Sequence, residues 1–295
     1  MFYITSAGLE GANATDALNA SLKGSAIGLG DTATVANAVT SAMNAYRASG
    51  LSAGKATDLL TAAVREGKLE ASELAPAMGK VLPLASAMGV GFEEVTAAFA
   101  AMSRTGTNAY EAATQIRAIM GQLAKPTTEA KNTLGEYGFT ADQVRKDLSK
   151  DFLGTLEKLL GAMEGNDEAL TSVFGNIRAL SGVLDMTGDN IEATREIFGS
   201  LKGAVGSTDK AFDVMKETAG YKFSVAMAKA RESMMQFGEA ALPVLTSVTS
   251  ALSTIAAPLS MLGSGLGKVT SGLSTFGGES MLVTAGLGAF LGSSD

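Results

Sequence analysis

Between about residue 30 and residue 207 the chain repeats one local pattern, in which a short polar residue or a glycine precedes an amphipathic run that ends at glycine. A Ser, Thr, Asp or Asn side chain accepts hydrogen bonds from the free N–H groups of a first helical turn, and glycine adopts the left-handed conformation that ends a helix. No run alternates apolar and polar side chains with β-branched character. The sequence therefore predicts an all-α fold of short, Gly-punctuated amphipathic helices.

Several helix boundaries follow from this pattern. Continuous helices are expected over 70–89 and 140–165, and a short helix or turn follows Pro126. Glu93 and Glu94 stand where carboxylates suit the dipole of a first turn, so they are interpreted as a helix start and not as an acid and a base. The predicted N-caps are Asp31, Ser52, Asn108, Thr140 and Asn166.

After about residue 208 the pattern changes to an apolar stripe with spacings of three, four and four residues. Such an eleven-residue period predicts one long helix over 208–257, about 75 Å in length, with a nearly straight apolar face. A face of that length needs a partner helix, from another copy or from the same chain folding back. Gly220, Gly238 and Pro243 each weaken this helix. The stripe consists of Phe212, Met215, Ala219, Phe223, Ala226, Ala230, Met234, Phe237, Ala241, Leu245, Val248 and Leu252.

These patterns divide the chain into four segments. Residues 1–30 form a partly helical N-terminal segment, 31–207 a helical core region, 208–257 the long helix, and 258–295 an apolar tail rich in Gly and Ser. Residues 240–267 carry no charge, and a second uncharged run covers 280–294. The first run is longer than the roughly 20 residues that cross a bilayer, but many of its residues are Ser, Thr, Gly or Pro.

Composition excludes several kinds of chemistry. The chain has no His and no Cys, so an imidazole base, a thiolate nucleophile, a Cys/His zinc site and a disulfide are all ruled out. Its net charge is −7, and without a dense Lys/Arg cluster no specific nucleic-acid binding is indicated. Glu279 alone motivates a cell-wall hydrolase, but it lacks a second functional group. The chain is therefore expected to be neither an enzyme nor a cofactor protein.

The stretch "DMTGDNIEATRE", residues 185–196, places carboxylates at the spacing of a calcium loop. Its sixth position, where such a loop needs Gly, is Asn190. The favoured interpretation is that Gly188 ends one helix and that Asp189, with Glu192, caps the next. No metal site is predicted.

Ordered phrases along the chain resemble the core region of phage tail tape measure proteins. They are the "LGDTA…AMNAY" opening, the "VREGK" helix end, the "GVGFEEV" start, "AATQIRAIMGQLAKPT" and the "RALSG…TGDN" junction. The resemblance covers about residues 20 to 260. Full-length members of the family usually carry a long ruler segment, whereas this chain begins almost at the core. Members often have Ser where Gly91 opens its helix, which predicts a weaker cap here.

The resemblance implies a structural virion protein. Such a protein lies as helical copies along the tail lumen, sets tail length during assembly in the host cytoplasm, and leaves the lumen before the DNA. The implied partners are further copies of the chain, the tail tube protein, tail assembly chaperones and baseplate or tail-tip proteins. The alternative is a membrane-active helical protein that inserts residues 240–292 into the host membrane.

Overall fold

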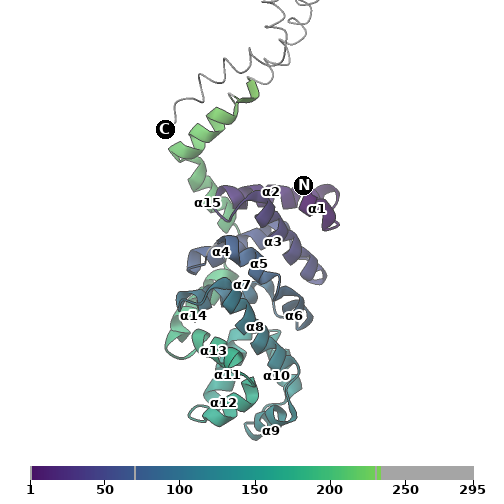
Figure 1. Cartoon of the computed structure of the whole chain (residues 1–295), viewed down its shortest axis with the longest axis vertical. Coiled ribbons are helices and arrows are strands. Elements are labelled where there is room, and N and C mark those ends of the chain that lie inside the picture. Colours follow the sequence, from purple (N-terminus) through teal and green to yellow (C-terminus); the bar gives the residue numbers. More distant parts are fainter. Residues whose placement is uncertain (1, 70, 230, 234–295) are drawn as a thin grey trace, which may run out of the picture. The chain divides into compact units, whose positions relative to one another are not determined.

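The computed structural model describes residues 2–69, 71–229 and 231–233 (Figure 1). Among these residues there is no strand, and helices joined by short turns make up the fold. The all-α prediction is confirmed. Contacts between Cα atoms divide the chain into two units, Met1–Tyr221 and Lys222–Asp295. The first unit is called the body below.

The body contains fifteen α-helices and two short 3-10 helices among its described residues. Its first half consists of α1 (Phe2–Ser6), α2 (Gly11–Ala26), α3 (Thr32–Ala45), η1 (Arg47–Ser49), α4 (Ala53–Glu66), α5 (Ala71–Met78), α6 (Leu82–Ala87) and α7 (Phe92–Arg104). Its second half consists of α8 (Ala109–Ala124), α9 (Thr128–Glu136), α10 (Ala141–Leu148), α11 (Phe152–Ala162), α12 (Asp167–Phe174), α13 (Ile177–Met186), η2 (Gly188–Asn190), α14 (Ile191–Lys202) and α15 (Ser207–Lys216).

Short polar side chains begin many of these helices. Asp31 accepts hydrogen bonds from the N–H groups of Ala33 and Thr34, and Ser52 accepts one from Lys55. The side chains of Asn108, Thr140 and Asn166 accept in the same way from Glu111, Gln143 and Ala169. All five predicted N-caps are thus confirmed. Gly91 opens α7 without a side-chain cap, as expected for a residue that has no side chain to accept with.

Helix α7 lies at the centre of the body. Eleven of its 13 residues are buried, because α4, α8, α13 and α14 all pack against it. Figure 1 shows α7 between α4 and α8. The buried residues of such a helix must be small or apolar, and those of α7 meet this condition with one exception, Glu94.

Helices α8 and α13 approach each other closely at Gly182. A Cβ atom added there would lie 2.8 Å from Gln115 Cβ and 2.8 Å from Met102 Cε. Real Cβ atoms do not come so close to other atoms, so the absence of a side chain at Gly182 permits this helix pairing.

The helix expected over 70–89 is two helices. Helix α5 ends at Met78 and α6 begins at Leu82. Pro83 stands in the first turn of α6, where its missing N–H has no helical partner to lose. In a continuous helix its ring would clash with the carbonyl group of Gly79, so the chain turns before it.

The helix expected over 140–165 is also interrupted. Helix α10 ends at Leu148, and α11 begins at Phe152 after Asp151, which accepts a hydrogen bond from the Gly154 N–H at 2.9 Å. Asp151 therefore acts as an N-cap within the predicted helix.

The long helix expected over 208–257 begins one residue early, at Ser207, and stops at Lys216. Glu217 and Thr218 form a turn, and the chain is helical again over 219–229 and 231–233. Thr218 Oγ1 accepts from the Tyr221 N–H at 3.3 Å, so Thr218 caps the second helix. An unbroken helix is therefore wrong at this point. The rest of the predicted helix and the tail at 258–295 lie outside the described residues.

Candidate functional site

The stripe predicted for self-association begins in α15. Phe212 and Met215 are half-buried, whereas Ala219, Phe223 and Ala226 are exposed, Phe223 to 67%. The stripe thus presents apolar side chains on the described helix after Thr218, and its role as an interface stays a prediction. The remaining members, Ala230, Met234, Phe237, Ala241, Leu245, Val248 and Leu252, lie outside the described residues.

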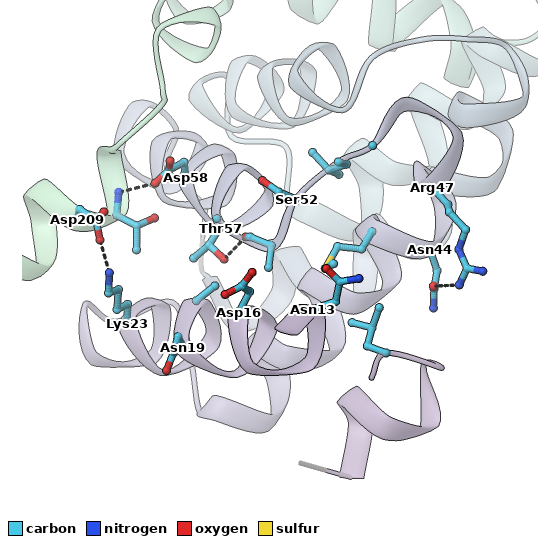
Figure 2. A pocket seen from close by; sticks show the side chains of 18 of the residues that line it. Asn13, Asp16, Asn19, Lys23, Asn44, Arg47, Ser52, Thr57, Asp58 and Asp209 are labelled. Atoms are coloured by element: carbon cyan, nitrogen blue, oxygen red, sulfur yellow. Dashed lines mark hydrogen bonds and ion pairs between the residues drawn. The ribbon is translucent and has the colours of Figure 1, made fainter. Parts of the chain in front are cut away.

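Helix α15 is the last helix of the body and carries the start of the stripe, and a distant carboxylate caps its first turn. Asp58, a buried residue of α4, accepts a hydrogen bond from the Gly206 N–H at 2.7 Å. It accepts a second from the Thr208 N–H at 2.9 Å (Figure 2). Gly206 precedes the helix with φ of +80° and offers no side chain as a cap. Asp58 therefore takes the place of the N-cap residue that the local sequence lacks. A cap of this kind contributes about 1 kcal/mol.

Two further polar contacts hold the same turn. The hydroxyl groups of Thr61 and Thr208 lie 3.0 Å apart in a buried position. On the other side, Lys23 Nζ of α2 lies 2.6 Å from Asp209 Oδ1. A buried hydrogen bond contributes about 0.5–1.5 kcal/mol, and an exposed ion pair such as Lys23–Asp209 contributes about 0–1 kcal/mol.

Apolar contacts contribute less to the docking of α15. Its buried residues are Ser207 and Thr208, whereas Val214 is 72% exposed. The ring of Phe212 meets the ring of Tyr221 edge-on at 6.0 Å. The buried apolar core of the body extends in sequence only to Ala204. Helix α15 is therefore attached to α2 and α4 mainly by polar groups.

A groove of about 850 Å³ opens beside this attachment. Asn13, Asp16 and Asn19 of α2 form one wall, and the start of α4 forms another (Figure 2). Asp58, Thr208 and Asp209 also line it. Among the residues the structure describes, no cluster of three or more metal-ligating side chains occurs.

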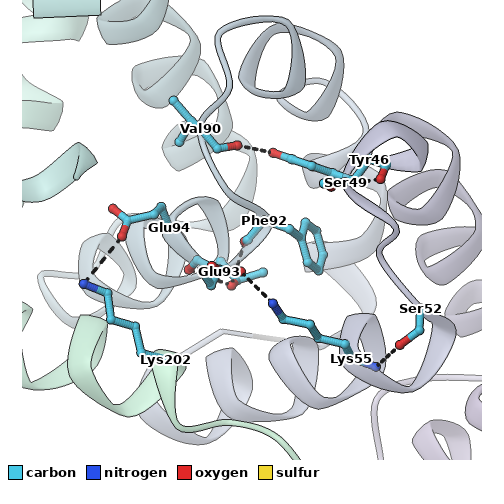
Figure 3. Close-up of polar contacts among 10 residues, drawn as sticks. Tyr46, Ser49, Ser52, Lys55, Val90, Phe92, Glu93, Glu94 and Lys202 are labelled. Carbon is cyan, nitrogen blue, oxygen red and sulfur yellow. Dashed lines mark hydrogen bonds and ion pairs between the residues drawn. The ribbon is translucent and has the colours of Figure 1, made fainter. Parts of the chain in front are cut away.

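A second buried carboxylate lies at the centre of the body. Glu94 Oε2 of α7 accepts from the Phe152 N–H at 2.9 Å. Lys202 Nζ of α14 lies 3.8 Å from Glu94 Oε1 (Figure 3). Burial raises the pKa of Glu94 above its ordinary value, although the Phe152 hydrogen bond and Lys202 act in the opposite direction. Glu94 thus caps the start of α11 from another helix.

The sequence interpretation of Glu93 and Glu94 is incomplete. Glu93 pairs with Lys55 of α4 at 3.2 Å near the surface, where a carboxylate suits the first turn (Figure 3). Glu94 instead joins three helices. The available signal was that every residue from 95 to 103, directly after Glu94, is small or apolar.

The segment 185–196 connects α13 and α14. Asp185 Oδ2 accepts from Thr107 Oγ1 at 3.0 Å, which ties α13 to the loop before α8. Gly188 follows the end of α13 with φ of +62°, as expected of a helix end. The predicted cap at Asp189 is wrong, because Gly188–Asn190 forms a 3-10 turn and α14 begins at Ile191 without a side-chain cap.

The described helices contain no span that is both long and apolar enough to cross a membrane. The uncharged segment 240–292 and Glu279 lie outside the part of the chain that the structure describes.

Comparison with known proteins places these features in a family. A model of the phage-related minor tail protein family matches residues 1–177, which is more than half of the 295 residues. The tape measure protein of Pneumococcus phage Dp-1 is 24% identical over 257 residues, which cover 85% of this chain and 22% of that protein. A probable tape measure protein of Clostridium phage phiCD119 is 25% identical over 190 residues, which cover 61% of this chain and 20% of that protein.

The chain thus spans about a fifth of the length of these curated relatives. No solved structure matches it significantly. The match over residues 1–177 runs from α1 to the start of α13 and so includes α7 and both groups that cap helices from a distance, Asp58 and Glu94. The chain therefore belongs to the phage-related minor tail protein family.

Proposed function

We propose that the chain acts as a tape measure component, which sets tail length during assembly and occupies the tail lumen before the DNA leaves. The similarity to two tape measure proteins carries this proposal. The role is structural and needs no catalytic group. Assembly takes place in the host cytoplasm, and the finished protein resides in the virion tail.

The proposal assigns different tasks to the two parts of the chain. The body is a packed set of helices, whereas the stripe continues along the C-terminal segment with its eleven-residue period. Copies of the chain pair through the stripe, where Phe223 and Ala226 are exposed. The tail tube protein, tail assembly chaperones and baseplate or tail-tip proteins are the further partners of such a component.

Tail length in the phage or prophage that encodes the chain tests this proposal. Insertion of four further eleven-residue periods after Leu252, about 44 residues, adds about 66 Å if the segment is helical. Tails measured by electron microscopy should lengthen by about this amount, because a helical ruler adds about 1.5 Å per residue.

A matched control inserts a segment of the same length between Glu164 and Gly165, in the exposed loop between α11 and α12. This insertion enlarges the body without extending the stripe, so tails should keep their normal length. Intact tails of unchanged length after the Leu252 insertion would contradict a ruler function.

No observation on the described residues favours the membrane-active alternative. Insertion of residues 240–292 into a host membrane stays a hypothesis based on the sequence alone.

A further inference from the structure

The last two helices of the body are attached in different ways. Helix α14 buries Ile197, Phe198 and Leu201 in the apolar core. Helix α15 buries only the side chains of Ser207 and Thr208. The change occurs between Ala204, which is 2% exposed, and Val205, which is 72% exposed. Gly206, which directly follows Val205, has a left-handed backbone conformation with φ of +80°.

The contacts of α15 also converge on its first turn. The Asp58 carboxylate accepts from the N–H groups of Gly206 and Thr208, and the Thr61 hydroxyl is hydrogen-bonded to that of Thr208. Lys23 forms an ion pair with Asp209 (Figure 2). Each contact is a polar group of α2 or α4 that water could replace on separation. Removal of α15 would therefore leave the apolar core of α2–α14 intact, because that core contains no side chain from α15.

We propose that α15 can detach from α2 and α4 and rebind, and we call it the strap. The Asp58 carboxylate, here called the clasp, holds it in place, and Val205–Gly206 is its hinge. The strap separates from α2 and α4 as one unit while α2–α14 stay folded. This inference rests on the proposed function and deepens it. A strap at this position gives α15 two arrangements, one held against α2 and α4 and one released from them.

Amide hydrogen exchange on the purified full chain tests the strap directly. Asp58→Ala removes the clasp, and Ala is the best helix former, so α4 itself is not weakened by the substitution. The amides of Gly206 and Thr208 should exchange about five- to tenfold faster in the variant. The amides of Leu59–Ala63 in α4 and Ile197–Leu201 in α14 should keep their wild-type rates.

Asp16→Ala is the matched control. Asp16 is also a helical aspartate lining the same groove, but it forms no hydrogen bond or ion pair with α15 among the residues drawn in Figure 2, where Asp58 and Lys23 are joined to that helix. Exchange at Gly206 and Thr208 should be unchanged in this variant. The strap is refuted if Asp58→Ala leaves both amides at their wild-type rates. It is equally refuted if α4 and α14 open together with α15, because α15 would then belong to the cooperative core.

A charge exchange on the surface provides an independent test should Asp58→Ala fold poorly. Lys23→Glu should accelerate exchange at Thr208, and adding Asp209→Lys should slow it again by restoring an ion pair of reversed sign. Absence of this rescue counts against the strap. These measurements concern the isolated chain, so they succeed or fail independently of the tail-length experiment.

Discussion

Glu94 is a buried residue of the body whose ionisation affects folding. Burial raises its pKa, so the folded chain binds the carboxyl proton more tightly than the unfolded chain does. The stability that this proton contributes is present below the ordinary pKa of a glutamate and is lost as pH rises through the raised, folded-state pKa. Above the folded-state pKa the charged carboxylate therefore opposes folding relative to its protonated form.

Glu94→Gln should remove this dependence. Gln is neutral at every pH, and its Oε1 can still accept from the Phe152 N–H. The free energy of unfolding of the variant, minus that of the wild type, should grow as pH rises from about 4 to about 8. Urea unfolding at a series of pH values measures the difference.

Glu94→Ala separates the charge from the hydrogen bond. The free energy of unfolding of Glu94→Ala should change with pH as that of Glu94→Gln does. It should be about 1–3 kcal/mol lower at every pH, because the Phe152 N–H loses its buried acceptor. Parallel pH profiles for wild type and Glu94→Gln would show that the carboxyl does not titrate in this way.

Helix caps could be predicted from the sequence where the capping residue directly precedes its helix. Asp31 and Ser52 cap the helices that directly follow them, so their hydrogen bonds can be inferred from spacing alone. Asp58 and Glu94 accept hydrogen bonds from N–H groups that lie 148 and 58 residues later along the chain. No local pattern contains these pairings, because they arise only when α4 meets α15 and α7 meets α11.

At the scale of elements, replacing either of two glycines in the packed helices α8 and α13 by Ala should change the stability of the body in opposite directions. Gly182→Ala should destabilise the body by about 1–3 kcal/mol, because its Cβ would meet Gln115 and Met102 where α8 and α13 are closest. Thermal unfolding measures the loss.

Gly121→Ala on α8 is the control for this substitution. Gly121 is exposed, and its Cβ would meet no atom within 4 Å. The change should stabilise the body by about 0.5–1 kcal/mol, because Ala has the higher helix propensity. A stabilising Gly182→Ala would show that α8 and α13 separate easily.

The sequence predicted correctly that these segments are helical, but it did not predict where each helix ends. Amphipathic periodicity continues through Asp151 and Thr218, so a stripe of apolar residues does not reveal that the helix stops and restarts there. Both residues are small polar side chains inside long apolar patterns, and each could have been identified as an internal N-cap. Which such residue ends a helix depends on the packing around it.

At the scale of the whole molecule, the stripe predicts self-association. Phe223→Asp places a charge on the exposed apolar face and should lower the mass of oligomers measured by light scattering at high concentration. The expected result is a shift toward monomer, because an interface between apolar side chains excludes an unpaired carboxylate.

Val214→Asp serves as the matched control. Val214 is as exposed as Phe223, at 72% against 67%, and is helical, but it lies off the stripe. Its substitution should leave the oligomer mass unchanged. Equal effects at both positions would indicate that any added surface charge lowers association, and that the stripe is not a specific interface.

The position of the last core residue, Ala204, has a mechanical consequence. Tension applied through the C-terminal segment reaches Tyr221 and Phe212 first, then the Lys23–Asp209 pair, and last the two N–H groups held by Asp58. Contacts loaded one after another peel apart at lower force than contacts loaded together. The attachment of α15 therefore yields before the apolar core does, so a pulled chain lengthens first at its C-terminal side.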